Sequence, residues 1–220
     1  MLACWSLMGP DMISEPAVIS AVILAAGASR RMGQPKMLLT WGNTVVIQKV
    51  VSTLLDGGVS LPVIVTGRAA EDIKRAVQSQ PVIWVHNPNY ETTEMLQSLQ
   101  IGLRSIPDGA TAFLIVLGDQ PQIETDVIRQ ITAEFNAHHP AIIIPSYQFR
   151  RGHPWLVNRN LLTEMLELPE EATLRQFLNA HSGSITYLNV DNPSVLMDLD
   201  TPAEYERQKP PDTNELHNEH

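Results

Sequence analysis

Short apolar runs alternate along the chain with longer segments that mix apolar and polar residues. The apolar runs are nearly continuous and rich in β-branched residues, which is typical of strands covered on both faces. They lie at residues 18–24, 62–66, 82–86, 112–117 and 141–145. The mixed segments suit helices and lie near residues 44–56, 70–79, 93–105 and 124–138. This alternation predicts an α/β fold with a mostly parallel sheet and helices on both of its faces.

The pattern becomes less regular toward the C-terminus, but it does not indicate a second domain. Helical patterns near residues 159–167 and 172–179 precede a last strand at 184–190 and a short helix at 202–208. The sequence has no internal repeat and no stretch rich enough in Gly, Pro or Ser to be a linker. We therefore expect one Rossmann-like domain over residues 17–208, preceded by an N-terminal extension at 1–16. The polar, proline-interrupted residues 209–220 predict a disordered tail.

Composition and charge argue against some classes of function. The 220 residues are 44% hydrophobic and 18% charged, as in an ordinary globular protein. The formal net charge of −9 argues against nucleic acid as a main partner. No apolar run is long enough to cross a bilayer, so we expect no membrane partner. Because the N-terminus lacks the positive region of a secretory signal and Cys4 is the single cysteine, we expect a cytoplasmic protein.

The first apolar run leads directly into a loop of small residues that carries three cations. Residues 18–36 read VISAVILAAGASRRMGQPK, so Arg30, Arg31 and Lys36 follow the small residues at 25–29. Small residues let a nucleotide lie against backbone N–H groups, and the cations can reach the same phosphates. A plain strand-to-helix turn would explain Gly27 but none of the cations. A dinucleotide fold is disfavoured because its G-x-G-x-x-G spacing is absent.

Candidate metal ligands follow other strands. In parallel sheets, ligands bind at the carboxyl ends of the strands, where Asp119 directly follows the apolar run AFLIVLG. An acidic group there is costly unless it is used, and a carboxylate is a ligand that Mg²⁺ prefers. Asp198 and Asp200 are candidates for a second carboxylate. The alternative is that Asp119 only begins a turn before Pro121, and that Asp200 caps the helix that starts at residue 202.

A further cluster lies after the fifth predicted strand, where residues 150–155 read RRGHPW. Two arginines, an imidazole and an indole suit a planar heterocycle that bears a phosphate. The alternative is a surface hairpin in which Trp155 packs in the core and His153 binds a backbone carbonyl.

Five motifs in order resemble those of one family. Leu24 to Lys36 match L-A-A-G-x-S-x-R-M-G-x-x-K in full, which resembles the opening motif of the MobA-like nucleotidyltransferases. The later motifs are similar to N-P-N-Y at 87–90 with Met95, Ser98 and Gly102, L-G-D-Q-P at 117–121, R-G-H-P at 151–154 and D-L-D-T-P at 198–202. The resemblance covers residues 17 to 207 and is greatest to the molybdenum cofactor cytidylyltransferase branch.

The resemblance implies a fold of the nucleotide-diphospho-sugar transferase type and an Mg²⁺-dependent reaction between CTP and molybdopterin. It implies nucleotide binding by Leu24, Ala25, Ala26, Gly27, Arg31, Lys36, Ser98 and Asp119. Among these, Arg31, Lys36 and Asp119 would be catalytic. Asp119 and Asp200 would hold the metal, and Arg151, His153 and Trp155 would bind the acceptor. A transient contact with a molybdoenzyme or its chaperone would follow from the product.

The sequence is also compatible with other functions. The resemblance favours CTP because Ala26 stands where the guanylyl branch tends to have glycine. The chain departs from the pattern just ahead of Met95, where Thr93 and Glu94 replace a usual glycine. A guanylyltransferase, a sugar-phosphate nucleotidyltransferase and a non-catalytic nucleotide- or pterin-binding chaperone are therefore the alternatives.

Overall fold

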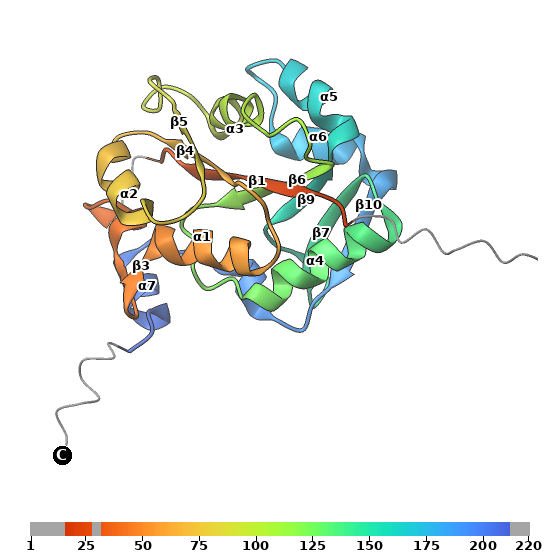
Figure 1. Ribbon diagram of the computed structural model, residues 1–220. Coiled ribbons are helices and arrows are strands. Elements are labelled where there is room, and N and C mark those ends of the chain that lie inside the picture. The colour runs from red at the N-terminus through yellow and green to blue at the C-terminus, as the bar shows by residue number, and fades with distance from the viewer. Residues whose placement is uncertain (1–15, 28–31, 212–220) are drawn as a thin grey trace, which may run out of the picture.

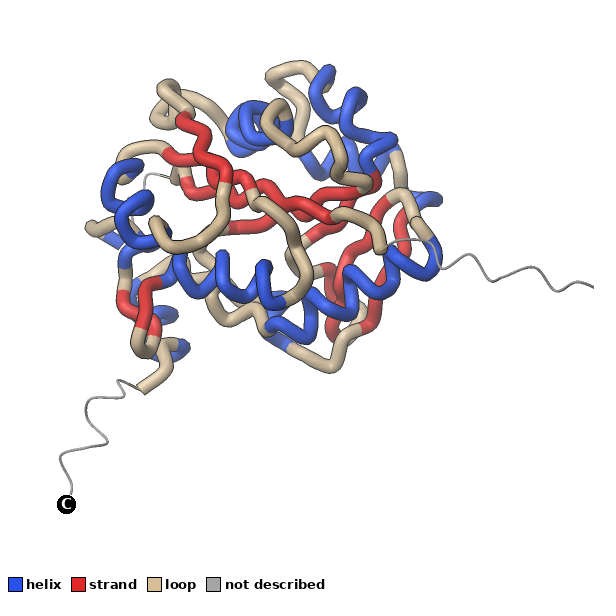
Figure 2. Tube along the Cα trace, in the orientation of Figure 1, coloured by secondary structure: helices blue, strands red, loops and turns tan. Residues whose placement is uncertain are grey.

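The computed structural model describes residues 16–27 and 32–211, which form three layers (Figure 1). A central sheet lies between two layers of helices, as Figure 2 shows from the same side. The predicted α/β class with a mostly parallel sheet is confirmed. The predictions for the N-terminal extension and for most of the tail fall on residues 1–15 and 212–220, outside the described residues.

The described residues form an eight-stranded sheet with the order β10-β7-β9-β6-β1-β4-β5, while β8 pairs with β7. The expected strands are β1 (Ile19–Ala25), β4 (Val63–Thr66), β5 (Ile83–His86), β6 (Ala112–Leu117), β7 (Ile142–Tyr147) and β10 (Ile185–Asn189). Neighbours among these strands pair in parallel. Two short strands, β8 (Arg150–Arg151) and β9 (Trp155–Asn158), run antiparallel to them and were not predicted.

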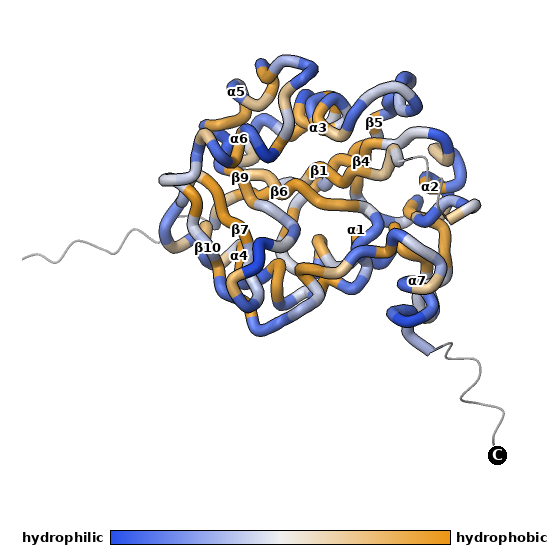
Figure 3. Tube along the Cα trace, turned by 180° about the vertical axis from the view of Figure 1, so that it is seen from behind, coloured by the Kyte–Doolittle hydropathy of each residue, from blue (hydrophilic) through white to orange (hydrophobic). Residues whose placement is uncertain are grey.

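Helices cover both faces of the sheet because alternate residues of the strands point to opposite sides. One layer contains α1 (Val46–Asp56), α2 (Ala70–Val77) and α4 (Thr125–His138), and the other contains α3 (Met95–Leu103), α5 (Leu162–Glu167) and α6 (Leu174–Ala180). In β1, Ile23 packs in the first core cluster and Val22 in the second. Figure 3 shows the apolar strands lying between more polar helices.

A close helix approach fixes α3 on the sheet. A Cβ atom on Gly102 would lie 2.5 Å from Cγ1 of Val22 and 2.6 Å from Cγ2 of Val65. A larger residue at position 102 would therefore push α3 away from β1 and β4. The glycine keeps the start of α3, with Ser98, close to the carboxyl ends of these strands.

A third, smaller hydrophobic cluster joins residues from the beginning and from the end of the described chain. A hairpin of β2 (Thr40–Trp41) and β3 (Thr44–Val45) packs with Leu199 and with α7 (Pro202–Gln208). Tyr205 on α7 donates a hydrogen bond of 2.7 Å to the carbonyl oxygen of Thr40. Because residues 44–45 pair as a strand, the first helix begins at residue 46, two residues later than expected.

Short 3-10 helices complete the chain at η2 (Lys36–Leu38), η3 (Arg159–Leu161), η4 (Ser182–Ser184) and η5 (Pro193–Leu196). Within residues 16–27 and 32–211, none of the helices has the length and apolar character needed to cross a membrane.

Candidate active site

Three charged residues from distant parts of the chain meet at one end of the sheet. Lys36 begins η2, Asp119 follows β6, and Asp200 lies two residues before the start of α7. The Lys36 Nζ atom donates to Asp119 Oδ2 at 3.2 Å and to Asp200 Oδ1 at 2.8 Å. The Lys36 side chain is 11% exposed, against 23% for Asp119 and 41% for Asp200. The fold therefore brings together three of the residues that the sequence singled out.

Asp119 is held by the loop that follows β6. The N–H of Gly118 donates to the carbonyl of Leu24 at 3.1 Å, which ties this loop to the end of β1. The side chain of Gln120 donates to the carbonyl of Met197 at 3.0 Å and to Asp198 Oδ1 at 2.8 Å. Sequence reasoning singled out Asp119 but missed the role of Gln120, which links its loop to the segment that carries Asp200.

Asp200 is positioned by its neighbours on both sides. Leu199 is fully buried in the third cluster, and the side chain of its neighbour Asp200 reaches the Lys36 ammonium. Thr201 is the N-cap of α7, and the Glu204 carboxylate accepts from the N–H groups of Asp200 and Thr201 at 3.0 and 2.8 Å. The alternative that Asp200 caps this helix is wrong. The T-P-A-E run at 201–204 is the capping-box signal that could have shown it.

Burial and charge act in opposite directions on these groups. Burial alone would lower the pKa of Lys36, but hydrogen bonds and charge from Asp200 and Asp119 raise it overall. Burial raises the pKa of Asp119 above its ordinary value, and the neighbouring Lys36 ammonium offsets this only in part. Lys36 is therefore a firmly protonated cation, and Asp119 is a carboxylate whose negative charge gains from a nearby cation.

The two carboxylates line a cavity of about 390 Å³, a size typical of small-molecule sites. The first loop contributes Leu24, Ala26 and Gly27, and α3 contributes Ser98. The other lining residues are Met37, Tyr90, Thr93, Glu94, Met95, Leu117 and Asp198. Predicted nucleotide-binding residues and predicted metal ligands thus share one cavity.

A buried amide shapes the wall of this cavity. Asn87 follows β5, and its Nδ2 donates to Ser98 Oγ and to Thr93 Oγ1, each at 2.9 Å. Its Oδ1 accepts from the N–H of Asn89 at 2.9 Å. Asn87 is fully buried, so these bonds fix the orientation of Ser98 and Thr93 at the cavity. Asn87 therefore positions a candidate base-reading side chain.

The remaining residues of the first loop lie at different places. Ala25 lines a second cavity of about 340 Å³ on the other side of Gly27, together with Gly33 and Arg68. Arg30 and Arg31, which the sequence singled out for the triphosphate, lie outside the described residues.

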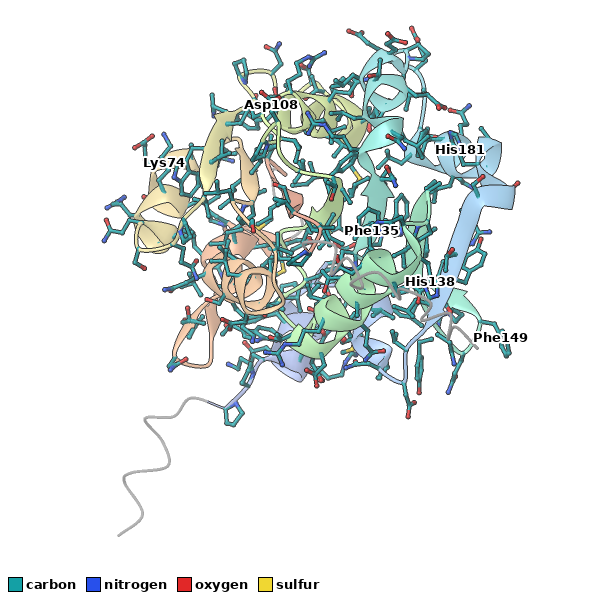
Figure 4. All side chains as sticks on the ribbon, turned by 45° about the vertical axis from the view of Figure 1, so that its right-hand side comes forward. Lys74, Asp108, Phe135, His138, Phe149 and His181 are labelled. Atoms are coloured by element: carbon teal, nitrogen blue, oxygen red, sulfur yellow. The ribbon has the colours of Figure 1, made fainter. Side chains whose placement is uncertain are left out.

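The predicted acceptor residues form a separate group. The rings of His153 and Trp155 stack with centroids 4.5 Å apart, while the Arg151 guanidinium lies 5.2 Å from the ring centroid of Tyr187 on β10. None of these three predicted residues lines the 390 Å³ cavity. Burial lowers the pKa of His153 to about 4, so its ring is neutral at pH 7. The hairpin tip beyond them carries Phe149, which points outward in Figure 4.

The two carboxylates form a candidate cation site without a larger ligand set. Over residues 16–27 and 32–211, no group of three His, Cys, Asp or Glu side chains converges as a metal site. Asp119 and Asp200 nevertheless both bind one cation, the Lys36 ammonium. Mg²⁺ is commonly held by one or two carboxylates together with substrate phosphates and waters. The pair fits a divalent ion whose other ligands come from a nucleotide.

The sequence and the fold also match those of known proteins. The family model described as the MobA-like NTP transferase domain matches residues 21–185. Molybdenum cofactor cytidylyltransferase of Escherichia coli (strain K12) is 27% identical over 188 residues, which cover 85% of this chain and 93% of the relative. A probable molybdenum cofactor guanylyltransferase of Bacillus cytotoxicus is 28% identical over 125 residues, covering 57% of this chain and 61% of the relative.

A solved structure shares both fold and sequence. Rv0371c from Mycobacterium tuberculosis H37Rv is 26% identical with a TM-score of 0.75, covering 88% of this chain and 98% of the other. A second structure of that protein, in complex with manganese, is 25% identical with a TM-score of 0.72 over the same shares of the two chains.

Proposed function

Because the chain belongs to the MobA-like NTP transferase family, which makes it a nucleotidyltransferase, we propose that it transfers CMP from CTP to molybdopterin. The product is molybdopterin cytosine dinucleotide, and pyrophosphate is released. One observation carries the proposal: Lys36, Asp119 and Asp200 meet at a cavity that also presents Ala26, Gly27 and Ser98. The single cysteine and this biosynthetic role lead us to place the reaction in the cytoplasm.

The reaction needs positioning more than covalent chemistry. An oxygen of the acceptor phosphate forms a bond to the α-phosphorus of CTP, and the bond from that phosphorus to the bridging oxygen of pyrophosphate breaks. The acceptor phosphate is largely ionised at neutral pH, so no strong general base is required. Lys36 supplies positive charge beside the phosphates, and the small residues 25–27 let the nucleotide approach the backbone.

Asp119 and Asp200 would hold Mg²⁺, which when bound offsets negative charge on the triphosphate and on the departing pyrophosphate. The manganese complex of Rv0371c supports a divalent ion in this family. Ser98, oriented by Asn87, and the backbone at Ala26 would contact the base. Arg151, His153 and Trp155 remain the proposed acceptor residues. A molybdoenzyme or its chaperone is the proposed recipient of the product.

A guanylyltransferase is the second candidate, because the Bacillus cytotoxicus relative carries that name at nearly the same identity over a shorter stretch. The test measures pyrophosphate release from CTP, GTP, ATP and UTP with Mg²⁺, with and without molybdopterin. We expect release that requires molybdopterin and prefers CTP. Preference for GTP would favour the second candidate, and release that ignores molybdopterin would refute the acceptor.

Two aspartate variants test the residues behind the activity. Asp119→Ala should abolish turnover because it removes a metal ligand, while CTP binding measured without a divalent ion should largely survive. Asp108→Ala is the matched control, since Asp108 is a fully exposed carboxylate in the loop between α3 and β6 (Figure 4). Full activity in Asp119→Ala would refute the metal assignment.

A further inference from the structure

The Lys36 ammonium contacts the same oxygen atoms that a divalent ion would need. Its Nζ lies 3.2 Å from Asp119 Oδ2 and 2.8 Å from Asp200 Oδ1, so one cation is shared by both carboxylates. The contact joins residues that are 83 and 164 positions apart in the sequence. The fold thus places a built-in cation directly at the proposed metal ligands.

The Lys36 ammonium and a divalent ion cannot both bind the Asp119–Asp200 pair with full affinity. With Lys36 in place, its positive charge already offsets part of the negative charge of Asp119 and Asp200. A divalent ion at the same oxygens would lie close to the ammonium in a partly buried setting, where charge repulsion is only weakly screened. Lys36 has a flexible stem of four carbons, so its ammonium can turn toward another anion when one is offered.

We propose that the Lys36 ammonium competes with the divalent ion for the Asp119–Asp200 pair, and that a bound triphosphate relieves the competition by giving Lys36 phosphate oxygens instead. The metal then binds well only together with the nucleotide. Linkage requires the converse as well, so the metal must raise nucleotide affinity by the same factor. The inference rests on the proposed function only for the identity of the anion that draws Lys36 away.

The test measures Mn²⁺ affinity of the full chain in the absence of nucleotide, by the electron paramagnetic resonance signal of free Mn²⁺. Lys36→Met removes the competing charge and keeps an unbranched side chain of similar length. Lys74→Met is the matched control, because Lys74 lies on α2 (Figure 4), pairs with Glu71 at 2.9 Å and does not line the cavity. It removes the same unit charge from the protein without touching the carboxylate pair.

We expect Lys36→Met to bind Mn²⁺ about tenfold more tightly than the unaltered protein, within the 5- to 150-fold range of ordinary couplings between sites. Lys74→Met should leave the affinity unchanged. Adding Asp200→Asn to Lys36→Met should abolish the gain. Equal or weaker Mn²⁺ binding by Lys36→Met would overturn the competition, as would an equal gain in Lys74→Met.

A second variant and a second readout guard against misfolding, because removing Lys36 leaves two carboxylates facing each other. Lys36→Gln keeps a hydrogen-bond donor without the charge, and it should show the same gain in Mn²⁺ affinity. Mn²⁺ should also raise the melting temperature of either variant more than that of the unaltered protein. No greater rise in either variant would contradict the proposal.

These measurements are separate from the proposed function. The Mn²⁺ affinities are taken without nucleotide or turnover, so a tenfold gain in Lys36→Met stands even if CTP proves to be the wrong substrate. Conversely, CTP-dependent turnover that is lost in Asp119→Ala, together with unchanged Mn²⁺ binding in Lys36→Met, would retain the function and overturn only the competition.

Discussion

Gly67 offers a sharp test of how the cavity is built. It directly follows β4, and a Cβ atom at this position would lie 2.7 Å from the carbonyl oxygen of Ala26 and 2.8 Å from Cγ of Tyr90. Both neighbours line the 390 Å³ cavity. Gly67→Ala must therefore displace the first loop, the tyrosine ring or both.

The size of the effect follows from the cost of overpacking. Forcing an extra methyl group into a packed site costs typically about 1–3 kcal/mol. In a domain of this size, each 1 kcal/mol lowers the melting temperature by roughly 2–4 °C, so we expect a drop of about 2–12 °C. If about 1 kcal/mol of the displacement falls on the nucleotide pocket, CTP affinity drops about fivefold.

The assays are thermal unfolding and calorimetric CTP binding. Gly109→Ala is the matched control, because a Cβ atom on Gly109 would have no atom within 4 Å. That variant should keep both the melting temperature and the CTP affinity. If Gly67→Ala behaved like Gly109→Ala in both assays, the close approach of β4 to the first loop would be refuted.

Two further predictions concern the rest of the site. The pKa of His153 falls from 6.5 unfolded to about 4 in the fold, so the unfolded state takes up the proton first, and stability is lost as the pH falls below 6.5 toward 4. Urea unfolding should show that the free energy of unfolding falls by about 2 kcal/mol between pH 7 and pH 5, and His153→Gln should largely lack this fall. Equal falls in the two proteins would contradict the role of His153. Thr201→Ala removes the α7 cap and should cost about 0.5–2 kcal/mol in unfolding free energy. It should also weaken Mn²⁺ binding with nucleotide, because Glu204 holds the Asp200 backbone through the same cap; an unchanged affinity would argue against this coupling.

Much of the architecture was predictable because periodicity is local. The long apolar runs at 112–117 and 141–145 became β6 and β7 within a residue or two, since buried parallel strands need continuous apolar sequence. The antiparallel strand β9 was missed. Its four residues, Trp155–Asn158, are too few to show a period, and their pairing with β6 and β7 depends on partners far along the chain.

In the candidate site, too, the residues with local signals were predictable and those that depend on distant partners were not. Asp119 stood out because a carboxylate after a buried strand is costly, and the first loop stood out because small residues and cations coincide. Local signals also encoded the α7 cap in T-P-A-E, although the alternative considered from the sequence placed this cap at Asp200. Asn87 and Gln120 stood in recognised motifs, but their roles were not predictable, because an amide is informative only once its partners are known.

The sequence by itself determined the order of the parallel strands and of the main helices, and it predicted an anion-binding first loop and two acidic motifs. These features depend on residues within a few positions of one another. Only the tertiary structure decided that Lys36 lies between Asp119 and Asp200, that Gly67 allows Ala26 and Tyr90 to approach, and that His153 is partly buried. Such contacts join residues far apart in sequence, and their distances follow from the packing of the whole domain rather than from any local pattern.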